Sequence, residues 1–131
     1  MLIHIPVSAG ELIDKITILR VKAERIGSDK KPHVIHELRL LEKVMDETLA
    51  PSPELAALTR RLAEVNASLW DIEDGKRACE RRGAFGGAFI ALARSVYIEN
   101  DRRAAIKRRI NEITGSEIVE EKSYPSDRAA P

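Results

Sequence analysis

The sequence has little of what builds disulfides, membrane spans or stacking surfaces. Of its 131 residues one is cysteine, and aromatic residues make up 4%. The single Cys79 excludes an internal disulfide and a multi-cysteine metal site, which favours a reducing compartment. No apolar run approaches the roughly 18 residues of a membrane span, and residues 1–7 lack the basic n-region of a signal peptide. We therefore expect a cytoplasmic protein with no membrane partner.

A charge excess of either sign is also missing. The 22 Lys and Arg residues nearly balance 21 Asp and Glu residues, which leaves a formal net charge of +1. The locally basic residues 101–109 have no interleaved aromatics and are bordered by acidic residues, so we expect no nucleic-acid partner. With 44% apolar and 33% charged residues, the composition is typical of one soluble globular domain.

Two helices are predicted in the first half of the chain. Apolar residues recur at helical spacing over residues 9–26 and again over residues 32–49. Ser8 and Glu11 have the spacing of a capping box, in which the hydroxyl accepts from the amide and the carboxylate reaches back. Pro32 is well suited to the first turn of the second helix. The two helices are expected to form a hairpin.

Two longer helices are predicted in the second half. Ser52 is expected to cap a third helix that begins at Pro53 and runs to about residue 82. The glycine-rich residues 83–87 lack the spacing of a phosphate-binding loop and predict a turn. A fourth helix follows this turn and ends at Gly115, which suits the left-handed cap position.

Short β-branched segments lie outside the four helices. Residues 3–7 and 118–122 are too short to be stable alone, so we expect them to pair as two strands. The predicted fold is therefore mainly α, a four-helix bundle with long helical hairpins and a small two-stranded β element joining the termini. Residues 1–122 are expected to form a single domain, and residues 123–131 a disordered tail.

Polar side chains interrupt the apolar face of the fourth helix, and others lie on the third. A buried cation needs a partner. Two interpretations remain open: buried ion pairs that fix the helix register, or a polar cleft between the third and fourth helices that binds an anionic or sugar-like ligand. The candidate ligand-binding residues are Asn66, Trp70, Glu73, Arg94, Tyr97, Asn100, Arg103 and Lys107. The first helix adds further polar residues near its capped end, namely Glu11, Asp14, Lys15 and Thr17.

The roles within this set can be predicted from position on the helix. We expect Arg103 to be held by a carboxylate of the first or third helix. Arg94 and Lys107 lie nearer the edges of the apolar stripe and are expected to be partly free. Two histidines, His33 and His36, share a helix face without a third ligand, so neither a metal nor another cofactor is predicted.

A second apolar patch is predicted on the first helix. Ile18 and Val21 lie away from its main apolar face, and long apolar stripes run along the other helices. These features predict a homodimer.

Three segments together resemble a bacterial family of short proteins of unknown function. They are residues 6–19 (PVSAGELIDKITIL), 66–74 (NASLWDIED) and 89–107 (FIALARSVYIENDRRAAIK). The resemblance spans residues 3–124. Some family members look associated with genes for surface-polysaccharide assembly, which implies a sugar-related partner. Gly86 and Gly87 stand where the family pattern has acidic residues.

A second similarity covers one helix. Residues 12–16, followed by Arg20 and Arg25, resemble the first helix of all-helical chorismate mutases, which implies a dicarboxylate held by basic side chains. The sequence favours a helical module that binds a partner protein or a polar, anionic small ligand at the cleft. The alternative is a small enzyme that acts on a sugar or carboxylate substrate there; no catalytic residue is identified.

Overall fold

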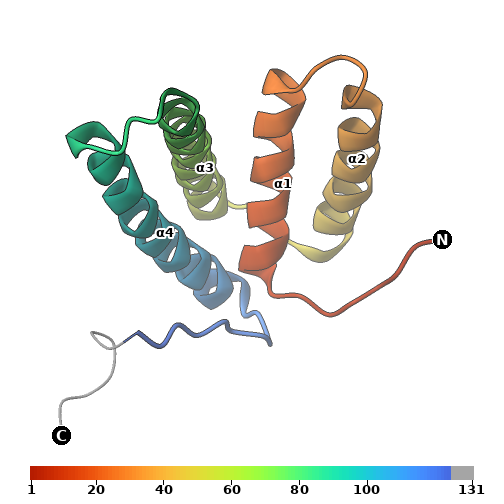
Figure 1. Cartoon of the computed structure of the whole chain (residues 1–131). Coiled ribbons are helices and arrows are strands. Elements are labelled where there is room, and N and C mark those ends of the chain that lie inside the picture. The colour runs from red at the N-terminus through yellow and green to blue at the C-terminus, as the bar shows by residue number, and fades with distance from the viewer. Residues whose placement is uncertain (125–131) are drawn as a thin grey trace, which may run out of the picture.

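Four α-helices make up most of the computed structural model, which describes residues 1–124. They are α1 (Ala9–Arg25), α2 (Lys31–Thr48), α3 (Pro53–Arg82) and α4 (Gly87–Thr114). The chain runs alternately up and down, so that α1 with α2 and α3 with α4 form two antiparallel hairpins (Figure 1). Within the described residues, no helix has the length and apolar character needed to cross a membrane.

The helix ends confirm the capping predictions. The Ser8 hydroxyl accepts from the Glu11 amide at 3.0 Å, and Ser52 caps α3 in the same way. Gly83 and Gly115 follow α3 and α4 with φ of 64° and 65°, a left-handed conformation that favours glycine. Local sequence chemistry therefore determines where α1 and α3 begin and where α3 and α4 end.

Helix α1 is the element against which the others pack. Its backbone approaches α2, α3 and α4, whereas α2 packs along α1. One apolar cluster joins α1, α3 and α4 and includes the fully buried Ile13, Leu62 and Ile110. A second cluster joins α1 to α2 and includes Ile16 and Leu38. Because α1 contributes to both clusters, its position determines how the two hairpins meet.

The far end of the α3–α4 hairpin extends away from α1. Figure 1 shows the two hairpins diverging toward the α3–α4 connection. The buried residues of α4 are Ile106, Ile110 and Asn111, which all lie in its second half. The first half of α4 is thus packed mainly on α3 and has a broad exposed side.

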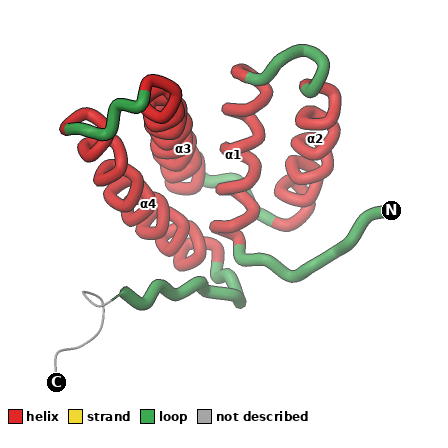
Figure 2. The backbone as a smooth tube through the Cα atoms, in the orientation of Figure 1, coloured by secondary structure: helices red, strands yellow, loops and turns green. Residues whose placement is uncertain are grey.

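The predicted β element is wrong. Residues 1–124 contain no strand (Figure 2), and the large apolar side chains of residues 1–7 are exposed. The chain ends approach each other through side chains instead, since Ser116 Oγ accepts from the Ala9 amide at 3.1 Å. These side-chain bonds take the place of a strand ladder. Residues 123 and 124 are irregular, and the rest of the predicted tail, residues 125–131, lies outside the described residues.

The second apolar patch expected on α1 is not a surface feature. Val21 is buried and Ile18 is half-buried, because α1 has neighbours on several sides. This pair therefore does not support the predicted homodimer.

Gly10 permits the close approach of α1 to α4. A Cβ atom at this position would lie 2.7 Å from the Lys107 carbonyl oxygen and 3.1 Å from the Lys107 Cα. We predict that Gly10→Ala lowers the free energy of unfolding by about 2 kcal/mol, because backbone atoms must shift to make room. Urea unfolding measures this loss.

Gly87→Ala is the matched control. Nothing lies within 4 Å of a Cβ at Gly87, and alanine is the better helix former. Its stability should be unchanged or slightly raised. Equal stability of the Gly10→Ala variant and the control would contradict the close approach.

Candidate functional site

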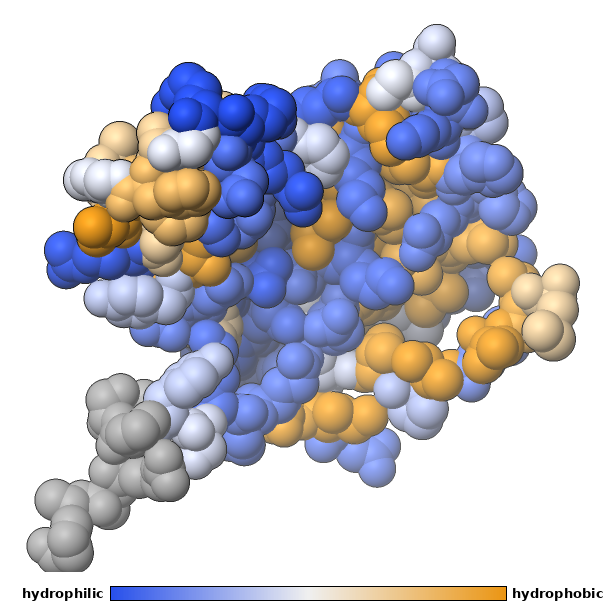
Figure 3. All heavy atoms as spheres, viewed as in Figure 1, coloured by the Kyte–Doolittle hydropathy of each residue, from blue (hydrophilic) through white to orange (hydrophobic). Residues whose placement is uncertain are grey.

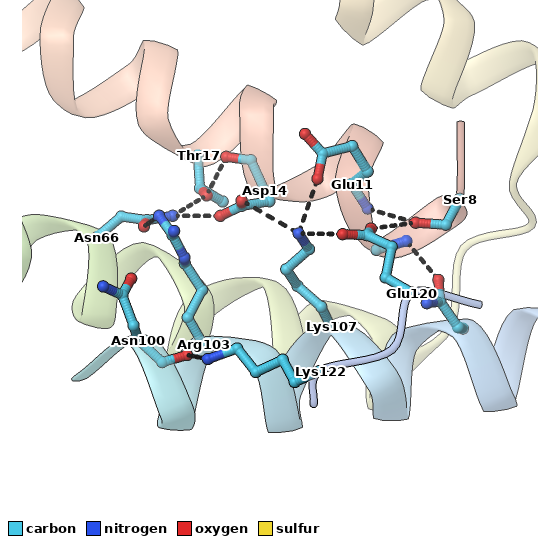
Figure 4. A network of polar contacts seen from close by, with 12 residues as sticks. Ser8, Glu11, Asp14, Thr17, Asn66, Asn100, Arg103, Lys107, Glu120 and Lys122 are labelled. Carbon is cyan, nitrogen blue, oxygen red and sulfur yellow. Dashed lines mark hydrogen bonds and ion pairs between the residues drawn. The ribbon is translucent and has the colours of Figure 1, made fainter. Parts of the chain in front are cut away.

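Three carboxylates surround the ammonium group of Lys107 (Figure 4). Its Nζ lies 2.7 Å from Glu11 Oε2, 3.2 Å from Glu120 Oε2 and 3.7 Å from Asp14 Oδ2. Glu11 and Asp14 are three residues apart on α1 and so share one helix face. The Lys107 side chain is 14% exposed. The network therefore joins α1, α4 and the C-terminal segment, defined as residues 116–124.

The capping box is formed in part. Glu11 supplies its amide to Ser8 as predicted, but its carboxylate binds Lys107. In a complete capping box, the Glu11 carboxylate would accept from the Ser8 amide. Here it accepts from the Lys107 ammonium group of α4, which gives a stronger, charge-assisted hydrogen bond.

Buried Asn66 extends the network to α3. Its Nδ2 donates to Asp14 Oδ1 and to Thr17 Oγ1, both at 2.9 Å, and its Oδ1 accepts from Arg103 at 3.4 Å. Asp14 thus uses one oxygen for Asn66 and the other for Lys107. Within the described residues, no buried side-chain nitrogen or oxygen lacks a hydrogen-bond partner. The contacts of α1 with α3 and with α4 therefore both include satisfied polar groups.

The first amides of α1 also bind side chains from the far end of the chain. The Gly10 amide donates to Asn111 Oδ1 at 2.7 Å, and the Ala9 amide donates to Ser116 Oγ at 3.1 Å. A helix leaves its first amides without internal partners. At α1 they are satisfied by α4 and the C-terminal segment, which fixes both against the helix start.

The pKa shifts in this network favour the charged forms of Lys107 and Glu120. Burial lowers the pKa of Lys107, but hydrogen bonding to Glu11 and the nearby Asp14 outweigh it, so the net shift is upward. Burial raises the pKa of Glu120, but hydrogen bonds from Ser8 and Lys107 outweigh it, so the net shift is downward. Both groups are consequently charged across the neutral range.

The structure reverses the predicted roles of two cations. Lys107, expected to be partly free, is held by carboxylates, whereas Arg103 has an amide oxygen as its hydrogen-bond partner and no ion pair within the described residues. The reason is the position of the carboxylates along the bundle. They come from the start of α1 and from the C-terminal segment, and both of these parts lie next to Lys107. Arg103 lies one turn before Lys107 on α4, beside Asn66.

A pocket of about 340 Å³ lies between α4 and the C-terminal segment. It is polar and is formed by four cations, two carboxylates, two asparagines, an alanine and a tyrosine. These lining residues are Asn100, Arg103, Ala104, Lys107, Arg108, Asn111, Glu120, Glu121, Lys122 and Tyr124.

The predicted site residues divide into two groups. Asn100, Arg103 and Lys107 line this pocket, and Asn66 bonds to Arg103 beneath it. The other four do not line the pocket. Trp70 is half-buried on α3, Glu73 pairs with Lys76 at 3.3 Å, and Arg94 and Tyr97 are exposed on α4.

The sequence places Asn111 beside the apolar stripe of α4, but neither Asn111 nor Glu120 is predicted as a site residue. Asn111 follows Lys107 by one helical turn, which is a usable signal for a shared face. Glu120 lies in an irregular segment, where no periodicity indicates which way a side chain points. Among the residues described, no group of His, Cys, Asp and Glu is arranged to hold a metal ion.

Comparison with known proteins gives a family without an assigned activity. Residues 3–131 match the model of a family of unknown function, DUF6165. No curated protein and no solved structure matches. The match confirms the expectation of an uncharacterised family, while its bacterial origin stays a prediction.

Lys107→Met tests the ion network directly. We predict a loss of about 3 kcal/mol in the free energy of unfolding, because three carboxylates then face one another without a cation. Lys122→Met is the control: Lys122 binds Asp101 at 3.1 Å, but both side chains are substantially exposed. Exposed pairs contribute little, so its stability should change by less than about 1 kcal/mol. Similar losses for both variants in urea unfolding would contradict the network.

Proposed function

This chain belongs to the DUF6165 family of unknown function, and we propose that it is a module that binds a small anionic ligand. The proposed site is the pocket between α4 and the C-terminal segment. The observation that supports this most is the environment of Arg103.

Arg103 lines the pocket without a carboxylate at ion-pair distance in the described residues, although its charge, with that of the nearer Lys107, lowers the pKa of Glu120 from a longer distance. Its three cationic neighbours there are paired: Lys107 with Glu11, Arg108 with Glu121 and Lys122 with Asp101. In the described part of the chain Arg103 forms a hydrogen bond to Asn66 at 3.4 Å and no ion pair. A guanidinium has five N–H donors and binds carboxylates or phosphates through two parallel hydrogen bonds. Arg103 therefore has donor capacity that an anionic ligand can use.

The other lining groups narrow the chemistry of the ligand. The volume of about 340 Å³ is at the small end of the range for small-molecule sites, which begins near 300 Å³. Asn100 offers an amide donor and acceptor suited to a hydroxyl group. A compact carboxylate or phosphate that also carries hydroxyl groups, such as a sugar phosphate or a hydroxy acid, fits this combination.

Glu120 provides an internal example of anion binding at this place. Its carboxylate binds the Ser8 hydroxyl at 2.9 Å and the Lys107 ammonium at 3.2 Å, so the local groups already hold one carboxylate. An incoming anion would bind beside it, at Arg103. The concave pocket favours a small molecule over a partner protein, whose surface would need a larger contact.

The pKa directions favour binding over acid–base catalysis. A proton-transfer group works best with a pKa near the working pH. The shifts of Lys107 and Glu120 move their pKa values away from neutrality. The enzyme alternative, action on a sugar or carboxylate substrate, therefore has less support. The single cysteine supports a cytoplasmic location for such a module.

Ligand-dependent thermal unfolding tests the proposal. Inorganic phosphate, succinate and glucose 1-phosphate are the probes, and at least one should raise the melting temperature of the full chain. Arg103→Gln should remove this rise, and it should lower the free energy of unfolding of the ligand-free protein by about 1 kcal/mol. The loss is expected because the buried Asn66 Oδ1 accepts a hydrogen bond from Arg103 in the wild-type chain.

Arg61→Gln is the control, since Arg61 is exposed on α3 and does not line the pocket. It should keep the full ligand-dependent rise. The proposal fails if no probe stabilises the wild-type chain, or if Arg103→Gln responds as strongly as Arg61→Gln. Consumption of a bound probe, followed by NMR, would favour the enzyme alternative.

A further inference from the structure

One side of α4 faces away from the rest of the bundle. Six of its exposed residues follow one stripe, on which positions three and four apart recur along the helix. The side chains that the helix buries, including Ile106 and Ile110, lie on the opposite side. We call this exposed stripe the outer face of α4; it consists of Ile90, Arg94, Tyr97, Ile98, Asp101 and Ala105.

The outer face is more apolar than a solvent-facing stripe should be. Ile90 and Tyr97 are each 55% exposed, and Ile98 is 39% exposed. The surface side of an amphipathic helix is ordinarily polar, and a contiguous exposed apolar patch marks an interaction site. Figure 3 shows apolar residues gathered on the surface toward the α3–α4 connection. A partner that covers this face would remove these side chains from water.

The charges on the outer face are arranged symmetrically. Arg94 and Asp101 are equally far in sequence from a point midway between Tyr97 and Ile98. Arg94 precedes this point and Asp101 follows it. In an antiparallel pair of identical helices with a two-fold axis at that point, each position meets its mirror position on the other copy. Arg94 then faces Asp101 of the second copy twice over, once on each side of the axis.

The remaining positions are also complementary under this symmetry. Tyr97 meets Ile98 of the second copy at the centre, and Ile90 meets the small Ala105 toward each end. Arg94 has no partner within the described residues, and the Asp101 side chain is 62% exposed, binding Lys122 through Oδ1. Both charged groups are thus accessible to a second copy.

We propose that this chain forms a homodimer through antiparallel pairing of the outer faces of α4. A face complementary to itself in charge and size favours a second copy over an unrelated protein. The proposal places Arg94 and Tyr97, two predicted ligand-binding residues, in a protein interface. It does not rest on the anion pocket, although the two surfaces adjoin, since Asp101 of the outer face binds the pocket-lining Lys122.

Charge reversal combined with light scattering tests this pairing. The wild-type chain should show a mass of twice 14.6 kDa at high micromolar concentration. Arg94→Asp places carboxylates opposite carboxylates, and Asp101→Arg places cations opposite cations. Each single reversal should raise the dimer dissociation constant at least about tenfold. The double variant, R94D with D101R, restores opposite charges and should return the constant to within about threefold of wild type.

Arg61→Asp is the control for an exposed arginine outside the outer face, and it should leave the dimer unchanged. Circular dichroism verifies that each variant is folded, and Tyr97→Ala supplies a second, uncharged disruption at the centre of the face. A wild-type mass of 14.6 kDa up to millimolar concentration overturns the proposal. So does a double variant as weakly associated as the two single reversals.

Discussion

The ammonium group of Lys107 is largely removed from water and is stabilised there by carboxylates from separate parts of the chain. Glu11 and Asp14 come from α1, and Glu120 comes from the C-terminal segment. Because a buried charge without partners costs several kcal/mol, α1 and the C-terminal segment must both be in place for this lysine to be accommodated. The close backbone contact at Gly10 depends on the same junction.

Helix α4 has three sides with different contacts. One side packs on the apolar core through Ile106 and Ile110. A second carries the ion network and the pocket beneath the C-terminal segment, where Arg103 has unused donor capacity. The third is the outer face, which we propose pairs with a second copy. A helix of ordinary geometry can serve all three, since residues three or four apart repeat on the same side.

Sequence reasoning predicted the helices well and the contacts between them less well. Ser8, Ser52, Gly83 and Gly115 act locally, so helix ends can be derived from neighbouring residues alone. The β element failed because side chains, not a strand ladder, join the chain ends. Helical periodicity gives the side of α4 on which Lys107 lies, but not which carboxylates reach it. The reversed roles of Lys107 and Arg103 follow from that missing information.

A double-mutant cycle between Lys107 and Glu11 tests most directly whether the ion network holds α1 to α4. Urea unfolding of wild type, Lys107→Met, Glu11→Gln and the double variant gives the coupling energy. We predict a coupling of about 2 kcal/mol, as expected for residues in direct contact within one network. A coupling within about 0.3 kcal/mol of zero, the value for independent sites, would contradict the central role of Lys107.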